Sequence, residues 1–236
     1  MAVSWRPFSC ILICACPAWS QPEVSPPDGT ILLTERSSVT LNWPAQGRAY
    51  QFVLWQDGRQ IIQCPLEANS LAVKVRPGSH YRWRVAVNGG KARVYEFSVA
   101  DRWEFHADGQ DGFGASGKNV AVRLERAAEG MRMHLECGAE SKDYLFLSTG
   151  KRFLITSRGG SGRDSQRSSS FYEYVVPGRP AGPGGWGGNV EVSTRDAPWR
   201  TYLKLDVSGG SGGAGSFEYV DGVDGQPGRV ITRILP

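Results

Sequence analysis

The sequence predicts an all-β chain of two domains, and two patterns lead to that prediction. In residues 22–99, apolar and polar residues alternate in short runs, which are separated by turn sequences such as Asp57-Gly58 and Pro77-Gly78. In residues 100–236, further strand-like runs alternate with glycine-rich tracts. No run has both the length and the 3.6-residue period that are typical of a helix.

The first 20 residues are typical of an export signal. Arg6 precedes a short apolar run at residues 8–15, and small residues follow at positions 18 and 20. The sequence Ile-Cys-Ala-Cys at residues 13–16 resembles the lipobox of bacterial lipoproteins, which implies lipidation of Cys16 as an alternative to free secretion. No other segment approaches the roughly 20 apolar residues of a membrane span. We therefore expect an extracellular or cell-envelope protein.

Composition and motifs argue against catalysis and nucleic-acid binding. The net charge of +4 is too balanced to indicate a nucleic-acid partner. No nucleophile elbow, phosphate loop, His-Glu-x-x-His motif or paired-cysteine metal motif occurs, so no catalytic residue is predicted. Glu104, His106 and Asp108 lie close enough to form a small polar site, although simple strand alternation explains them as well. Outside the signal, Cys64 and Cys137 form either a disulfide or two separate thiols.

Strand alternation defines the first domain. Residues 39–43, 50–54, 71–75 and 81–85 each place apolar side chains at every second position, as expected of strands in an antiparallel sandwich. Trp55 falls in the opposite phase, which makes it a candidate for contact with a ligand.

One segment of this domain resembles a known family. In residues 75–85, an apolar residue, a Pro-Gly turn and Tyr81 lead into a strand, and this resembles the fibronectin type III pattern. The opening segment Pro26-Pro27-Asp28-Gly29, Trp43 and Tyr50 match the pattern as well. The resemblance implies a seven-stranded, immunoglobulin-like β-sandwich that acts as a spacer or binding module without catalysis.

The second domain is defined by its glycines. Of the 30 glycines, six lie in residues 21–99 and 24 in residues 100–236. They recur at every third position in tracts that begin at Gly109, Gly182, Gly209 and Gly222, and each tract leads into a strand-like run. A three-residue period suits packed polyproline II helices, and flexible linkers are the alternative. The pattern resembles the polyglycine-helix layers of phage tail-tip adhesins and of glycine-rich bacterial surface proteins, which implies a surface module.

Candidate binding residues lie in this glycine-rich domain. Arginines and aromatic residues are suited to acidic groups, polysaccharides or interfaces. The candidates are Arg158, Arg163, Arg167, Tyr172, Tyr174, Trp186 and Trp199.

Two similar Asp-Gly motifs carry a second hypothesis, which concerns a metal ion. Asp108 and Asp111 belong to one motif, and Asp221 and Asp224 belong to the other. If the two motifs meet, their carboxylates provide oxygen ligands for calcium; ordinary Asp-Gly turns are the alternative.

The sequence as a whole predicts an exported, non-catalytic surface or envelope protein with an adhesion role. In this prediction, the glycine-rich domain binds a protein or polysaccharide partner and the fibronectin-like domain is a spacer. A structural subunit of an extracellular matrix, sheath or filament is the first alternative, and a carbohydrate-active enzyme is the second.

Overall fold

The structure is a computed structural model, and it describes residues 24–236 except 46, 48, 88–90, 149, 167–168, 172–173, 177 and 196–197. It confirms the all-β prediction: the described elements are strands and one 3-10 turn, η1 Trp199–Thr201. The predicted export signal with Cys16 lies outside the described residues, as do Arg167 and Tyr172. No helix in the described part of the chain is long and apolar enough to cross a membrane.

Ten of the strands form one mixed sheet in the order β17-β15-β9-β10-β11-β1-β7-β6-β3-β4. Three more form a small sheet in the order β16-β12-β8, and two antiparallel pairs, β2–β5 and β13–β14, complete the fold. The strands are β1 Thr30–Leu33, β2 Ser38–Asn42, β3 Tyr50–Gln56, β4 Arg59–Leu66, β5 Ser70–Lys74, β6 His80–Val87, β7 Arg93–Val99, β8 Glu104–His106, β9 Val120–Ala127, β10 Gly130–Cys137, β11 Glu140–Phe146, β12 Phe153–Thr156, β13 Ser169–Phe171, β14 Tyr174–Val176, β15 Val190–Thr194, β16 Leu203–Asp206 and β17 Val230–Ile234.

The first seven strands form a two-layered sandwich. Strands β1, β7, β6, β3 and β4 form one layer, and the pair β2–β5 forms the other. The predicted alternation holds, since Trp43, Phe52 and Trp83 are buried together with ring centroids 5.6 to 6.0 Å apart. At the start of β6, the Tyr81 hydroxyl accepts a hydrogen bond from the Arg76 N–H at 2.8 Å. This bond fixes the turn that leads into the strand.

Strand β1 joins the two halves of the chain. It pairs in parallel with β7 on one side and with β11 on the other. Successive side chains of a strand point to opposite faces, and accordingly Leu32 packs in the sandwich core while Leu33 packs in a second core. The large sheet therefore runs without a break past the predicted domain boundary at residues 99–100.

The second core lies between the large sheet and the small one. Phe105, Phe153 and Leu203 of the small sheet pack in one cluster with Val122 and Val192 of the large sheet. Strands β8, β12 and β16 run parallel to one another, as do β9, β15 and β17. After each strand of the small sheet the chain leaves the core, and it returns to the core at β9, β15 or β17.

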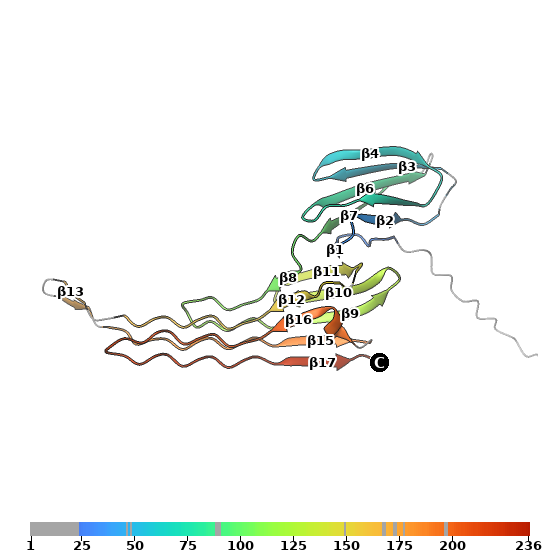
Figure 1. Cartoon of the computed structure of the whole chain (residues 1–236). Coiled ribbons are helices and arrows are strands. Elements are labelled where there is room, and N and C mark those ends of the chain that lie inside the picture. The colour runs from blue at the N-terminus through green and yellow to red at the C-terminus, as the bar shows by residue number, and fades with distance from the viewer. Residues whose placement is uncertain are drawn as a thin grey trace, which may run out of the picture.

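Between these strands the chain makes three excursions that lie side by side as a narrow arm (Figure 1). In each excursion, an outgoing tract follows a strand of the small sheet and a return tract leads into a strand of the large sheet. The outgoing tracts are residues 107–112, 157–165 and 207–215, and the return tracts are residues 113–119, 181–189 and 221–229. The strand-like run at 217–220 belongs to the turn between the last two tracts, where Ser216 bridges to Tyr219.

Backbone hydrogen bonds between different tracts hold the arm together. The Gly160 N–H donates to the Ala115 carbonyl, the Gly185 N–H to the Gly160 carbonyl and the Gly210 N–H to the Gly185 carbonyl, each at 2.8 Å. Along the return tract 181–189, the donors toward the neighbouring outgoing tract recur at every third residue, which is the period of a polyproline II helix. The tracts are therefore ordered elements and not flexible linkers.

The close approach of the tracts requires glycine. A Cβ atom on Gly185 would overlap the Ala115 carbonyl oxygen, and one on Gly159 would overlap the Gly185 carbonyl oxygen. Glycine is entropically costly to order, so the inter-tract hydrogen bonds have to offset that cost.

The structure corrects the possible disulfide. Cys64 and Cys137 are both free thiols, on β4 and β10 respectively. Five strands of the large sheet separate β4 from β10, so the two cysteines cannot approach within the roughly 7 Å between Cα atoms that a disulfide needs.

Gly185→Ala is expected to destabilise the arm by about 1 to 3 kcal/mol or more, because the new methyl group would displace the Ala115 backbone. Gly182→Ala in the same tract is the matched control, since the nearest atom to its Cβ would be the Arg163 nitrogen at 3.2 Å. Denaturant unfolding of both variants measures the difference. Equal losses would mean that close backbone approach does not determine the stability of the arm.

Candidate functional site

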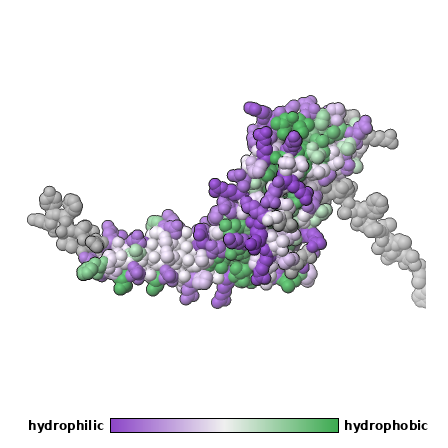
Figure 2. Space-filling view, viewed as in Figure 1, coloured by the Kyte–Doolittle hydropathy of each residue, from purple (hydrophilic) through white to green (hydrophobic). Residues whose placement is uncertain are grey.

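The arm has two long faces of different chemistry. One is formed by the return tracts and the other by the outgoing tracts. Figure 2 shows a pale glycine surface along the arm, on which separate hydrophobic side chains stand out along the lower edge. Exposed apolar side chains on an ordered backbone are candidate contact residues.

We call the exposed side of the return tracts the return face. Its side chains come from every third residue of each tract, the edge that is not packed against the outgoing tracts. They are Phe113, Ser116 and Asn119, then Pro183, Trp186 and Asn189, then Val223, Gln226 and Arg229, and all nine residues are exposed. Phe113 is 76% exposed, Trp186 64% and Val223 73%.

Hydrogen bonds align these residues in rows across the three tracts. The Gly117 N–H donates to the Trp186 carbonyl, and the Gly187 N–H donates to the Gln226 carbonyl. Trp186 therefore lies level with Ser116 on one side and Gln226 on the other. Because a polyproline II helix rises about 3.1 Å per residue, neighbouring rows lie about 9 Å apart.

The row at the base of the return face is an amide ladder. The Asn119 Oδ1 accepts the Asn189 N–H at 2.9 Å, and the Asn189 Oδ1 accepts the Arg229 N–H at 2.9 Å. Both amides thus use their oxygen atom within the protein. Their Nδ2 groups, together with the Arg229 guanidinium, are the donors that this row can offer to a ligand.

The return face continues onto the outer side of the large sheet, where two shallow depressions lie. One, of about 330 Å³, includes Asn119, Asn189 and Glu191, and the other, of about 340 Å³, includes Arg123 and His134. Charges here are paired within the protein. The Glu191 carboxylate contacts the Arg233 guanidinium at 2.8 Å.

His134 is a second paired group on this side of the sheet. Its ring lies 2.8 Å from the Asp143 carboxylate and 2.9 Å from that of Glu136. The hydrogen bond to Asp143, followed by that to Glu136, raises the pKa of His134 above its usual value.

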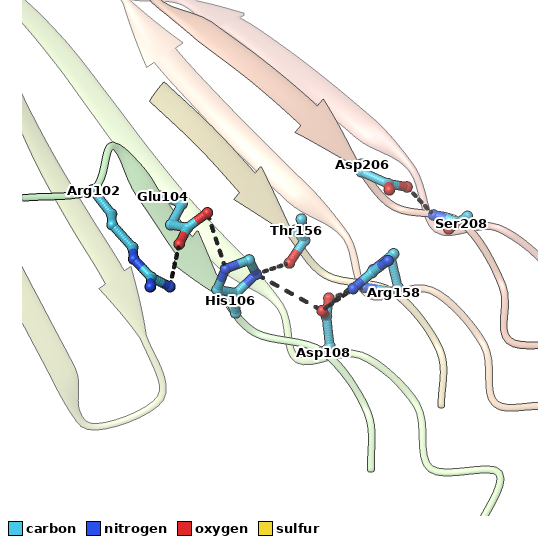
Figure 3. Close-up of polar contacts among 8 residues, drawn as sticks. All are labelled: Arg102, Glu104, His106, Asp108, Thr156, Arg158, Asp206 and Ser208. Atoms are coloured by element: carbon cyan, nitrogen blue, oxygen red, sulfur yellow. Dashed lines mark hydrogen bonds and ion pairs between the residues drawn. The ribbon is translucent and has the colours of Figure 1, made fainter. Parts of the chain in front are cut away.

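The outgoing face is polar, and its residues line up across strands and tracts (Figure 3). His106 Nδ1 lies 2.8 Å from the Thr156 hydroxyl, and His106 Nε2 lies 3.6 Å from the Glu104 carboxylate. Asp108 accepts hydrogen bonds from the Arg158 backbone N–H at 2.7 Å and from its Nη2 at 2.9 Å. The structure thus brings together Glu104, His106 and Asp108, the three residues that the sequence suggested as a small polar site.

Carboxylates of this face secure the outgoing tracts to one another. Burial by itself raises the pKa of Asp108, but the hydrogen bonds from Arg158 outweigh burial and leave the pKa below its usual value. The Asp111 Oδ1 accepts the Ser161 N–H at 2.9 Å, and this bond lowers the pKa of Asp111. Asp164 accepts the Ala214 N–H at 2.8 Å in the same manner. These side chains serve as inter-tract hydrogen-bond acceptors.

The structure corrects the geometric premise of the calcium hypothesis, because the two Asp-Gly motifs do not meet. Asp108 and Asp111 lie on the first outgoing tract, whereas Asp221 and Asp224 lie on the last return tract, at the other edge of the arm. Asp224 accepts the Gly212 N–H at 2.8 Å, and Asp221 accepts the Gly215 N–H. No group of three or more metal-ligating side chains occurs among the residues that the structure describes.

The predicted contact residues have different outcomes. A residue that contacts a ligand has to be exposed, and Trp186 is exposed. Trp199 is not: it is only 8% exposed, because η1 places it in the second core. Arg163 is exposed, and Trp55 is half-buried.

The other predicted contact residues are engaged or undescribed. The Arg158 side chain is engaged by Asp108. Of Tyr174 the structure describes the backbone in β14 and not the side chain.

Sequence reasoning missed Phe113, Pro183 and Val223. The signal for them was present, since each lies one residue after a glycine of a three-residue repeat.

The chain as a whole matches no protein-family model, no curated protein and no solved structure. The candidate site therefore rests on its geometry.

Acid should weaken the outgoing face. The folded pKa values of Asp108 and Asp111 lie below their unfolded values, so their stabilisation is complete above about pH 4 and is lost as pH falls through the folded values. The double variant Asp108→Asn/Asp111→Asn keeps both oxygen acceptors and removes the titration. Urea unfolding between about pH 2.5 and 6 should show a shallower decline in stability for this variant. Glu129→Gln, at an exposed turn, is the control and should retain the parent's pH dependence.

Proposed function

We propose that this chain is an exported, non-catalytic surface protein that binds a polysaccharide or protein partner through the return face of its arm. One observation carries the proposal: Phe113, Trp186 and Val223 are exposed together on one side of a hydrogen-bonded backbone. Apolar side chains held in water by a rigid scaffold favour binding, since a ligand removes their surface from solvent at little cost in chain ordering. Export rests on the sequence of residues 1–20.

The surroundings of Trp186 favour a polysaccharide as the first ligand to test. Sugar rings combine apolar C–H faces with hydroxyl groups, so they are suited to a surface that combines an indole with hydrogen-bonding side chains. Gln226 lies in the same row as Trp186, and Asn119, Asn189 and Arg229 form the next row. A chain of sugars lying along the arm would meet the indole and the donors in succession.

The first seven strands support the role of a spacer. Their division into the layers β1-β7-β6-β3-β4 and β2-β5 supports our proposal of a fibronectin type III-like sandwich. The hydrogen bond from the Arg76 N–H to the Tyr81 hydroxyl is the tyrosine corner that is typical of immunoglobulin-like domains. In this proposal, the sandwich carries the arm and does not contact the ligand.

The polar groups of the outgoing face support a structural role better than catalysis. Asp108 and Asp111 are occupied by hydrogen bonds to backbone N–H groups of the neighbouring tract. Both carboxylates line an open depression of about 250 Å³, together with Arg158, serines and glycines. A reaction on a sugar needs carboxylates that are placed to act on a bound bond, and here the carboxylates hold the arm together.

Trp186→Ala in the full chain should weaken polysaccharide binding about tenfold or more, because buried aromatic contacts in interfaces are worth about 2 kcal/mol. Phe113→Ala should weaken binding less, since Phe113 lies one row further along the face. Isothermal titration against polysaccharides selected on a glycan array measures both effects.

Ser211→Ala, on the outgoing face, is the matched control and should bind like the parent chain. If Trp186→Ala also binds like the parent, the return face is not the binding surface. If Ser211→Ala loses as much affinity as Trp186→Ala, the assignment to one face is wrong.

A further inference from the structure

Strand β17 forms one end of the large sheet, and no other strand in the described part of the chain pairs with its outer edge. All five of its residues are exposed, including Val230 at 42%, Ile231 at 39% and Ile234 at 76%. An exposed edge strand with apolar side chains is a template for pairing with another chain. The nine residues of the return face do not include β17, and the inference does not rest on the proposed ligand binding.

The hydrogen bonds to β15 show which backbone groups point outward. The Val190 N–H donates to the Arg229 carbonyl, and the Leu235 N–H donates to the Thr194 carbonyl. Backbone groups alternate in direction along a strand, so residues 231 and 233 also face β15. Residues 230, 232 and 234 therefore present both their N–H and their carbonyl groups to the open edge.

The side chains of the same residues lie on the core side of the sheet. Val230, Thr232 and Ile234 pair with Val190, Val192 and Thr194, which are buried against the second core. The open edge thus combines unpaired backbone groups with apolar side chains that continue a buried surface. Covering it would remove both kinds of group from water.

Two other edges carry features that disfavour pairing with another chain. On β4, at the opposite end of the large sheet, Pro65 lacks an N–H donor. On the arm, Asp224 and Asp221 accept the N–H groups of Gly212 and Gly215 on the last outgoing tract. In the return tract 181–189, the Gly187 N–H donates to the next return tract. The equivalent residue of the last return tract is Pro227, which has no N–H to donate. These three positions therefore cannot donate to a further glycine tract.

Strand β17 carries no such block. It contains no proline, and its one charged residue, Arg233, is paired with Glu191 at 2.8 Å. This open strand continues directly from the edge of the arm, where Gly212, Gly215 and Pro227 offer no free N–H donor.

We propose that β17 pairs antiparallel with β17 of a second copy of this chain, around a two-fold axis at Thr232. Thr232 then faces Thr232 of the second copy, and Val230 faces Ile234 of the second copy. Each of these pairs exchanges two backbone hydrogen bonds, because these are the residues whose backbone groups point outward. The large sheets of the two copies become one continuous sheet.

The pattern of β17 favours a second copy as the occupant. Val230 and Ile234 lie at equal distances on either side of Thr232, so two-fold pairing places apolar side chains opposite apolar side chains. Arg233 falls opposite Ile231 of the second copy and not opposite another arginine. The contact uses the same residues on both copies and therefore closes as a dimer instead of growing as a filament.

Analytical ultracentrifugation of the full chain over a range of concentrations tests the proposal. The parent chain should be a dimer, and Thr232→Pro should be a monomer over the same range, because proline removes the central donor and introduces a clash at the axis. Ile61→Lys on the edge strand β4, where Ile61 is 44% exposed, is the matched control and should remain a dimer. A parent that is monomeric at every concentration, or a Thr232→Pro variant that still dimerises, would overturn the proposal.

Disulfide trapping tests the register and does not depend on a proline. In a Cys64→Ser background, Thr232→Cys should form a covalent dimer under mild oxidation, because the two cysteines face each other across the axis. Ile231→Cys is the control and should give at least tenfold less covalent dimer, because it faces Arg233 of the second copy. Equal trapping by the two variants would exclude the proposed register and overturn the inference.

Discussion

The arm depends on one constraint, the close approach of one backbone to another where a Cβ atom is missing. At Gly185 and Gly159, neighbouring carbonyl oxygens occupy the space that any other side chain would fill. This approach brings N–H and carbonyl groups of different tracts within hydrogen-bonding distance, and these bonds replace the ladder of a β-sheet. A hydrophobic core is not needed along the arm. One core lies inside the sandwich, and the other lies between the two sheets from which the arm projects.

Because of the same constraint, the residues that pack a tract differ from the residues that it exposes to solvent. Three residues make one turn, so a tract has three edges; in the return tract 181–189, two edges pack as glycines and the third is free to carry other side chains. On the return tracts one such edge carries aromatic, proline and amide residues, whereas the outgoing tracts carry carboxylates that accept backbone N–H groups. Side chains on the return face can therefore be exchanged with little effect on the packing beneath them. This separation is what a binding scaffold requires.

Local patterns in the sequence predicted much of the fold. Alternation located the buried residues of the sandwich, such as Phe52 and Trp83, because burial on one face of a strand has a period of two. Glycine spacing indicated packed tracts but left flexible linkers as an alternative. Features that depend on distant partners were not predictable: Trp199 is buried because η1 turns it into the second core, and Asp221 and Asp224 cap glycines of another tract. Nor did the sequence show which edge of each tract stays exposed, since that depends on the order in which the tracts pack.

Each tract continues directly into a β-strand, and the tracts run along the direction of those strands (Figure 1). A load applied at the far end of the arm is therefore transmitted along the strands, where it acts on many hydrogen bonds in shear and does not open them one after another. Because both ends of every excursion enter a sheet, tension on one turn is divided between two strands that belong to different layers. The architecture thus gives a slender projection mechanical strength that its small number of side-chain contacts would not provide.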